Sequence, residues 1–322
     1  MSKAPKDIFQ KCRDYRDTAD ARAQGFYPYF RSIEEPHGNY VICEGERKIM
    51  IGSNNYLGLA QDPRVVEAAC EAIKKYGSGC TGSRLLNGTI KLHVELEEAL
   101  ADFLGRDAAI LFSTGFFANQ GALIALTEDG DAILCDRENH ASIIDGCNFA
   151  PGKLIPFRHN SASSLENRLK RLPDEAGRVV ILDGVFSMSG DIADLPEINA
   201  AAKRHHAAMY VDEAHSLGVL GRQGRGAVDH FGLNDEVEIV MGTFSKSLGS
   251  MGGFIAGDAQ MIEYLKHRAR CLIFTAALAP AVVGGVKKAL ELMQEETWRI
   301  DQLWKNTRKM HEGFKRIGFK IG

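Results

Sequence analysis

The sequence predicts an α/β fold with a mostly parallel central sheet flanked by helices. From about residue 63 onward, short β-rich apolar runs alternate with segments of helical periodicity, which is the pattern of a parallel sheet with crossover helices. Several of these runs are apolar throughout, for example Val179-Val180-Ile181-Leu182. Strands of this kind are covered on both faces, so we expect helices on both sides of the sheet.

Seven strands are predicted, at residues 108–113, 132–136, 153–157, 178–183, 207–212, 238–243 and 253–256. Helices are predicted between and around them, among others at residues 63–76, 92–104, 196–206 and 280–314. Pro63 follows the N-cap residue Asp62 and suits a first helical turn, and Gly105 ends the second helix.

The length of 322 residues allows about two domains, at roughly 150 residues each. We predict an N-terminal segment at 1–60, a large α/β domain at 61–285, and a linking helix with the start of a smaller C-terminal domain at 286–322. Residues 316–322 resemble the first strand of that smaller domain, which then stops. The sequence therefore looks incomplete at this end.

The composition is that of an ordinary globular protein. Apolar residues make up 45% and charged residues 25% of the chain, which argues against disorder and fibrous structures. The formal net charge is −3, so there is no basic footprint for nucleic acid. The seven cysteines include no C-x-x-C pair, which favours reduced thiols over a disulfide framework or structural zinc.

No membrane span and no secretory leader are predicted. The strongly apolar stretch at 271–286 contains Pro280 and two glycines, and it is shorter than the ~18–20 residues that a bilayer needs. The N-terminal residues continue into a charged run at 11–22 without an apolar h-region. We therefore expect a cytoplasmic protein.

Three short patterns match known motifs but lack the structural context or the spacing that those motifs require. Residues 77–82 match G-x-G-x-x-G but follow a predicted helix rather than a strand. Residues 212–215 match a Walker-B lettering, but the glycines of a phosphate loop are missing before Lys246. His205 and His206 lie at a helix end without metal-ligand spacing, so no metal site is expected.

Polar residues follow several of the predicted strands, at the edge where open α/β sheets bind their ligands. The run from Ser113 to Phe117 joins a strand to a helix, so the amides of Gly115 and Phe116 could receive a phosphate. Asp212 ends a buried strand, and a buried carboxylate needs a cation or a donor. A protonated heterocyclic nitrogen would suffice, although a helix N-cap is the alternative.

Lys246 lies just past another strand, among small residues that would let a bulky ligand approach. Burial there would lower its pKa and free the amine for Schiff-base chemistry, whereas the alternative is an exposed loop lysine. His140 also follows a strand. Its imidazole could stack on an aromatic ring, although a capping or core histidine is equally common.

These residues resemble those of the α-oxoamine synthases, which are fold-type I enzymes that use pyridoxal phosphate (PLP) to join an amino acid to an acyl-CoA with loss of carbon dioxide. The resemblance covers essentially the whole chain. It is carried by the stretches at 54–59, 81–84, 113–119, 139–142, 184–188, 212–215 and 242–253. Stretches at 77–79, 86–89, 157–161, 243–247 and 273–276 are more similar to the serine user of the family than to its glycine or alanine users.

The resemblance implies roles for individual residues. Lys246 is similar to the lysine that binds PLP as a Schiff base and later moves the α-proton, and Asp212 to the acid that pairs with the pyridinium nitrogen and keeps it protonated. His140 resembles the histidine stacked on the ring, so Lys246, His140 and Asp212 are the implied catalytic residues.

The other cofactor contacts that the resemblance implies are Gly115, Phe116, Thr243 and Ser245 around the phosphate, His215 and Ser187 near the phenolic oxygen, and Thr275 reaching the phosphate from a neighbouring subunit. Asn55 and Ser83 would line the substrate entrance. The family pattern also implies a homodimer with shared active sites. In this family the arginine that binds the substrate carboxylate lies in the small domain, and no matching position precedes Gly322.

The implied reaction is the condensation of serine with palmitoyl-CoA to 3-ketosphinganine, the first step of sphingolipid synthesis. The alternatives within the family are 8-amino-7-oxononanoate synthase and 2-amino-3-ketobutyrate CoA ligase, which differ in the amino acid and thioester used. A non-catalytic partner subunit is a further alternative, which the presence of Lys246 disfavours.

Overall fold

A computed structural model of the chain describes residues 7–321. By its internal contacts the chain divides into two compact units, Met1–Ser53 and Asn54–Gly322. The helices that follow residue 285 belong with the second unit. The assignment of residues 286–322 to a linking helix and the start of a small domain stays a prediction.

The first unit contains two short helices, α1 (Gln10–Asp14) and α2 (Asp17–Ala23), and a small antiparallel sheet of β1 (Ile33–His37), β2 (Tyr40–Cys43) and β3 (Glu46–Ile49). Two-residue turns join its strands. Glu44 and Gly45 in the second turn both have positive φ, at 57° and 72°, which gives the twist that an antiparallel hairpin requires. The sequence predicted an N-terminal segment at 1–60, without strands assigned to it.

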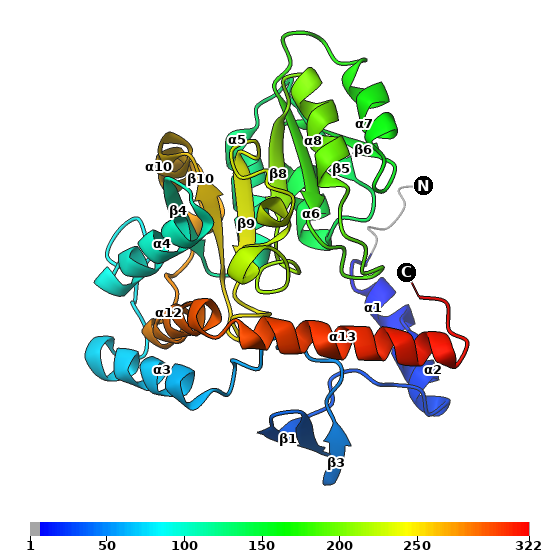
Figure 1. Cartoon of the computed structure of the whole chain (residues 1–322), viewed down its shortest axis with the longest axis vertical. Helices are drawn as coiled ribbons and strands as arrows, with labels where there is room; N and C mark the ends of the chain where they lie inside the picture. Colours follow the sequence, from blue (N-terminus) through cyan, green and yellow to red (C-terminus); the bar gives the residue numbers. More distant parts are fainter. Residues whose placement is uncertain (1–6, 322) are drawn as a thin grey trace. The chain divides into compact units, whose positions relative to one another are not determined.

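The second unit is built on a seven-stranded sheet with the order β4-β10-β9-β8-β7-β5-β6 (Figure 1). The strands are β4 (Ala108–Phe112), β5 (Ala132–Asp136), β6 (Lys153–Phe157), β7 (Arg178–Asp183), β8 (Ala208–Asp212), β9 (Ile239–Thr243) and β10 (Gly253–Gly257). Of these, β10 runs antiparallel to both of its neighbours, and the other pairings are parallel. All seven predicted strands are confirmed to within one residue, and so is the mostly parallel sheet.

Helices follow or precede most strands of this sheet. They are α3 (Pro63–Tyr76), α4 (Lys91–Leu104), α5 (Gly115–Leu126), α6 (Ala141–Phe149), α7 (Ala162–Leu169), α8 (Leu195–Arg204), α9 (Ala227–His230), α10 (Ala259–Arg268), α11 (Arg270–Ile273), α12 (Pro280–Glu295) and α13 (Trp298–Arg316), with a 3₁₀ turn η1 (Arg222–Gly224). The long helical stretch predicted from residue 280 is two helices, because the backbone leaves the helical conformation at Glu296.

Helices cover both faces of the sheet, as the apolar strands predicted. Residues of α4, α7, α8 and α12 pack in one core with Val180 and Leu182 of β7. Residues of α5, α6, α10 and α11 pack in a second core with Ile181. Because successive strand side chains point to opposite faces, β7 contributes to both cores.

The strand expected from residue 316 onward is wrong. Helix α13 extends to Arg316, and its end is closed by a turn in which the amide of Phe319 donates to the carbonyl of Phe314 at 3.0 Å. Residues 317–321 are not part of a strand, because a strand needs a neighbour to accept its backbone hydrogen bonds. Among residues 7–321, no helix is both long and apolar enough to cross a bilayer.

Candidate active site

A cavity of about 310 Å³ lies at the edge of the sheet where the parallel strands end, within the size range of small-molecule sites. Strands β4, β5, β7, β8 and β9 all direct their carboxyl ends to this edge. The structure places most of the predicted site residues around this cavity, namely Gly115, Phe116, His140, Asp212, His215, Thr243, Ser245 and Lys246.

Lys246 reaches the cavity from the loop after β9. The loop is tight: the amide of Gly249 donates to the carbonyl of Lys246 at 2.9 Å, and Gly249 has φ of +62° with no room for a Cβ beside Ala60. Burial lowers the pKa of Lys246, against the opposing charges of Asp212 and Asp183. An amine with a lowered pKa is a better nucleophile, as the sequence predicted.

Asp212 ends β8 and is 3% exposed. Its carboxylate accepts hydrogen bonds from the side-chain amide of Asn119 at 2.7 Å and from the backbone amide of Ala214 at 2.9 Å. The second bond closes a local turn, but no helix begins there, because the next helical element starts at Arg222. The N-cap alternative is therefore wrong. Asp212 lines the cavity with Lys246, so the acid and the amine face one ligand space.

A second acid, Asp183, lies directly opposite Asp212 in the register of β7 and β8. Burial first, and then the charge of Asp212, raise the pKa of Asp183 to about 8. Its carboxyl group accepts a hydrogen bond from the backbone amide of His140 at 2.9 Å. The sequence argument missed this residue, although it ends a buried strand just as Asp212 does.

His140 is the N-cap of α6 and also lines the cavity. Its Nδ1 accepts from the amide of Ser142 at 3.2 Å and lies 2.8 Å from the Ser142 hydroxyl. A nitrogen that accepts from a backbone amide carries no proton, so the neutral ring is protonated on Nε2. The capping and the ligand-facing roles considered from the sequence are therefore compatible.

The N-terminus of α5 forms the anion-binding end of the cavity. Thr114 caps the helix by accepting from the amide of Phe117 at 3.0 Å, and the amides of Gly115 and Phe116 in the first turn have no acceptor among the described residues. A Cβ on Gly115 would lie 2.9 Å from Oγ1 of Thr243, so only glycine allows this close approach.

Two hydroxyls complete the anion-binding end. Oγ1 of Thr243 donates to the carbonyl of Gly252 at 2.9 Å and lies 2.9 Å from the hydroxyl of Ser245. Both hydroxyls lie on residues that line the cavity. The proton of Thr243 is used by the carbonyl of Gly252, so the Ser245 hydroxyl and the helix amides are the neutral donors available to a phosphate group.

His215 lies in the turn after β8, between the cavity and a second one of about 250 Å³. Burial first, and then the charges of Lys246 and His140, lower its pKa to about 4, so the ring is neutral at pH 7. Ser187 lines the second cavity together with His215 and Tyr56. The expected neighbourhood of Ser187 and His215 is therefore present, although Ser187 does not line the first cavity.

The structure does not bring Asn55, Ser83 and Thr275 to this cavity. Oδ1 of Asn55 accepts from the amide of Ala60 at 3.2 Å, which stabilises a local turn. Ser83 is bridged to Ala276, next to Thr275, beside a space of only about 10 Å³. Thr275 was expected to act on a neighbouring subunit, so its role and those of Asn55 and Ser83 remain predictions.

The family model for aminotransferases of class I and II matches residues 46–322. The chain belongs to this family. It is 48% identical over 315 residues to a serine palmitoyltransferase from Sphingobacterium spiritivorum, an alignment that covers 98% of this chain and 79% of the relative. It is 43% identical over 307 residues to an 8-amino-7-oxononanoate synthase from Thermosipho melanesiensis, which covers 95% of this chain and 78% of the relative.

Solved structures agree with this assignment. A serine palmitoyltransferase from S. paucimobilis with a bound aldimine of PLP and myriocin has a TM-score of 0.94 and 39% identity, and the match covers 98% of this chain and 80% of that one. The fold is therefore that of the fold-type I PLP transferases, as the sequence predicted.

The residues of this aminotransferase-family site fit PLP. The helix amides and hydroxyls at one end suit its phosphate, Asp212 suits a protonated ring nitrogen, and the amine of Lys246 suits its aldehyde. The groups for the phosphate and the amine lie around a single cavity, which is the arrangement that one flat ligand requires.

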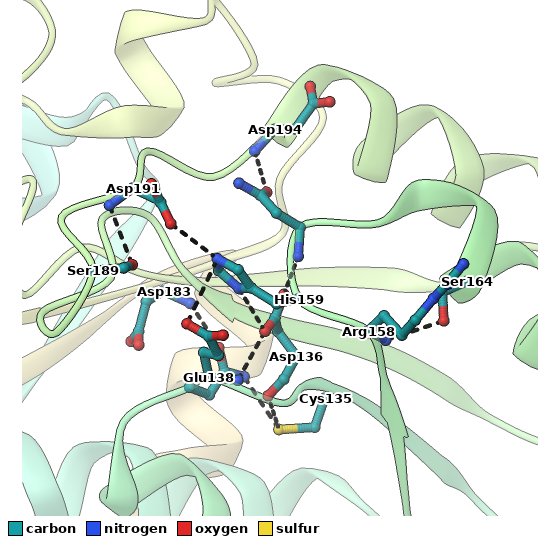
Figure 2. A network of polar contacts seen from close by, with 12 residues as sticks. Cys135, Asp136, Glu138, Arg158, His159, Ser164, Asp183, Ser189, Asp191 and Asp194 are labelled. Atoms are coloured by element: carbon teal, nitrogen blue, oxygen red, sulfur yellow. Dashed lines mark hydrogen bonds and ion pairs between the residues drawn. The ribbon is translucent and has the colours of Figure 1, made fainter. Parts of the chain in front are cut away.

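A polar network beside the site fixes its supporting loops (Figure 2). Buried Asp136, at the end of β5, accepts from Nδ1 of His159 at 3.0 Å and from the amide of Asn160 at 2.8 Å. Nε2 of His159 lies 3.3 Å from Asp191, in the loop that follows Ser187. The network therefore connects the carboxyl end of β5 to the loop that carries Ser187.

Proposed function

We propose that this chain is a PLP-dependent acyltransferase that condenses L-serine with palmitoyl-CoA, or a similar long-chain thioester, as serine palmitoyltransferases do. The product would be 3-ketosphinganine, the first intermediate of sphingolipid synthesis. Relatives named serine palmitoyltransferase match over nearly the whole chain. The observation that carries the proposal is that Lys246 and Asp212 line one cavity together with the N-terminus of α5, which can bind an anion.

The proposed reaction balances without an external oxidant or reductant. The Cα–H bond of serine breaks, and the amine of Lys246 takes up the proton. A bond then forms between Cα and the acyl carbon of the thioester, and the carbon–sulfur bond breaks to release coenzyme A, whose sulfur takes up a proton. The bond from Cα to the carboxyl carbon then breaks, carbon dioxide leaves, and Cα takes up a proton. Bound PLP supplies an electron sink for the negative charge that develops at Cα.

The residues of the chain have separate tasks in this proposal. Lys246, with its lowered pKa, holds the cofactor and exchanges the proton at Cα once the substrate amine has taken its place. Asp212 stabilises positive charge on the ring nitrogen, and its position is fixed by Asn119 and Ala214. His140, held by Ser142 and Asp183, lines the cavity, where it would contact the ring and orient the substrate.

The second candidate is 8-amino-7-oxononanoate synthase activity, which the relative from Thermosipho melanesiensis favours. It uses the same site chemistry with a different amino acid and thioester. The higher identity to serine palmitoyltransferases, 48% against 43%, favours serine. The remaining family alternative, 2-amino-3-ketobutyrate CoA ligase, differs in the same way. A non-catalytic subunit is disfavoured because Lys246 is present and faces the cavity.

A substrate matrix tests the proposal. The purified full-length protein is loaded with PLP and offered L-serine, L-alanine or glycine with palmitoyl-CoA, pimeloyl-CoA or acetyl-CoA. Release of coenzyme A is followed by its thiol and the product by mass spectrometry. We expect turnover with serine and palmitoyl-CoA. Turnover with alanine and pimeloyl-CoA but not with serine would reject our choice, and absence of a cofactor absorbance band would favour the non-catalytic subunit.

We also propose a homodimer with shared active sites and a cytoplasmic location. The dimer is supported by the family pattern for Thr275, which lines a separate small space and not the cavity that Lys246 lines. The location is supported by seven cysteines that are all free thiols, as expected in a reducing compartment. Light scattering and cell fractionation test these two points. Asn55 and Ser83 are proposed to line the substrate entrance.

A further inference from the structure

The hydroxyl of Tyr56 lies 2.8 Å from Nδ1 of His215. This contact joins residues that are 159 positions apart, and it connects the two cavities, because Tyr56 lines the smaller one and His215 lines both. The site chemistry described above gives Tyr56 no task. Its contact with a ring that faces the cofactor cavity nevertheless determines which nitrogen of His215 carries a proton.

The direction of this hydrogen bond follows from the two groups. Burial raises the pKa of Tyr56, so the phenol keeps its proton. His215 has its pKa lowered to about 4, so its neutral ring offers one nitrogen as an acceptor and one as a donor. A phenol facing Nδ1 therefore donates to it, and the ring proton lies on Nε2.

A second acceptor competes for the phenol proton. Oδ1 of Asn54 lies 3.4 Å from the Tyr56 hydroxyl, at the outer limit of a hydrogen bond, whereas Nδ1 of His215 is at 2.8 Å. Hydroxyl donors form their bonds mostly at about 2.7–2.8 Å. If Nδ1–H donated to the phenol instead, the phenol proton would have only the long contact to Asn54, so donation from the phenol to Nδ1 is the better arrangement.

Both partners are held firmly. Leu57 and Leu59, which follow Tyr56, are 4% and 0% exposed, and the carbonyl of Leu57 accepts from Arg299 at 2.9 Å. On the other side, the buried carboxylate of Glu213 accepts from the amides of Ala227 and Val228 at 2.7 and 2.8 Å. The phenol and the imidazole are thus positioned by separate buried anchors.

We propose that Tyr56 is a positioning residue that fixes His215 in the Nε2-protonated tautomer, so that His215 presents a hydrogen-bond donor to the phenolic oxygen of PLP. The second part of this inference, that His215 donates to PLP, rests on the proposed PLP-dependent function. The tautomer itself does not depend on which amino acid or thioester is used. Without the Tyr56 hydroxyl, the ring would populate both tautomers, and the donor would be present for only part of the time.

Nitrogen NMR of histidine-labelled protein tests the tautomer directly. The His215 signals are assigned by their loss in His215→Asn. In the wild type we expect Nδ1 to resonate as an unprotonated and Nε2 as a protonated imidazole nitrogen, with and without PLP. In Tyr56→Phe, which keeps the ring and removes the hydroxyl, the ratio of the two tautomers should fall about fivefold, the worth of one ordinary hydrogen bond.

The absorbance of bound PLP gives a second readout. A donor at the phenolic oxygen favours its deprotonated form, so Tyr56→Phe should raise the pH midpoint of the cofactor band by about half to one unit. The kcat should fall about threefold to tenfold while the KM for serine changes less than about twofold. Tyr264→Phe, at an exposed position of α10, and Asn54→Ala should change neither the spectrum nor the tautomer.

Three outcomes would overturn the inference: a protonated Nδ1 in the wild type, a tautomer ratio unchanged in Tyr56→Phe, or a shift in Asn54→Ala as large as in Tyr56→Phe. A thermal melt of each variant shows that a change does not come from misfolding. If the tautomer result holds but serine is not turned over, the substrate assignment fails and the positioning role stands.

Discussion

The two edges of the central sheet differ in what their polar side chains do. At the amino ends of the parallel strands a cavity of about 350 Å³ is slightly larger than the 310 Å³ cavity at the carboxyl ends. Charged residues that line this cavity form hydrogen bonds with backbone groups. Asp131 accepts from the amide of Gly177 at 3.1 Å, and Arg178 donates to the carbonyl of His205 at 2.7 Å. Asp258 caps α10.

The carboxyl edge leaves side chains directed at the cavity instead. Nζ of Lys246 has no hydrogen-bond partner within residues 7–321, and its pKa is lowered by burial. Neighbouring groups are also shifted, His215 downward and Asp183 upward. Groups with perturbed pKa values gather at functional sites. The two edges therefore do not differ much in cavity size. They differ in that the carboxyl edge holds buried titratable groups with shifted pKa values, one of which, the amine of Lys246, has no hydrogen-bond partner within residues 7–321.

Removing the amine at the carboxyl edge should have the largest effect. Lys246→Ala deletes the group that holds the cofactor and moves the proton, so turnover should fall at least about 1,000-fold. The cofactor should also lose its covalent absorbance band. Lys74→Ala, at an exposed position of α3, is the matched lysine control. Retention of turnover by Lys246→Ala within about tenfold would contradict the assignment of the site.

A matched pair of acids compares the edges directly. Asp212→Asn removes the charge opposite the ring nitrogen, and breaking a buried charge pair costs about 2–5 kcal/mol, or roughly 30-fold or more in kcat/KM. Asp258→Asn, at the other edge, should leave kcat/KM within about twofold and lower stability by a few tenths of a kcal/mol, since asparagine also caps helices. Equal effects on kcat/KM would remove the distinction between the edges.

Tyr210 connects the two edges and should give a smaller, structural effect. Its ring lines the amino-edge cavity, while its hydroxyl donates to Oδ1 of Asn119 at 2.8 Å, the residue that donates to Asp212. Tyr210→Phe leaves that buried oxygen without a donor, so the free energy of unfolding should fall by about 1–3 kcal/mol.

Urea denaturation measures the effect of Tyr210→Phe, with Tyr76→Phe as the control. Turnover should fall only a few-fold, because Asn119 keeps its bond to Asp212. A loss of turnover as large as that of Asp212→Asn, at unchanged stability, would mean that Tyr210 belongs to the active site and not to its support.

The smallest expected effect concerns the network of Figure 2. Burial lowers the pKa of His159, but the hydrogen bonds to Asp136 and Asp191 and the charge of Glu138 outweigh it and raise the pKa overall. Protonated His159 therefore stabilises the fold. This contribution is complete below the unfolded pKa of about 6.5 and is lost as the pH rises through the higher folded pKa.

His159→Gln should accordingly lower the free energy of unfolding by about 1 kcal/mol near pH 6, and by less at pH 8. Urea denaturation at the two pH values measures this difference, with exposed His311→Gln as the control. A deficit that is the same at both values, or larger at pH 8, would show that the charge of His159 does not stabilise the loop.

Much of the fold could be predicted from the sequence, because the strands that make the sheet are marked by local patterns. The run Val179-Val180-Ile181-Leu182 is apolar at every position, and the structure places its residues in both cores. The hairpins of the first unit were missed because β1, of sequence Ile-Glu-Glu-Pro-His, is exposed at every position. A strand without a buried face has no apolar alternation to detect.

Asp183 and Tyr56 show where prediction of the site stopped. Asp183 ends a buried strand and could have been found by the argument used for Asp212, but its shifted pKa depends on the side-by-side pairing of β7 and β8. Tyr56 lies outside any strand, and nothing in its neighbours along the chain indicates a partner 159 residues away.

The sequence by itself determined the order of strands and helices along the chain and the strand ends that carry polar groups, because these follow from periodicity and turn chemistry within short stretches, and its family resemblance implied PLP. Only the tertiary structure decided which of those groups meet. The approach of Gly115 to Thr243, of Asp183 to Asp212 and of Tyr56 to His215 arises from strand order and packing, which join residues far apart in the chain, and local patterns carry no record of those distances.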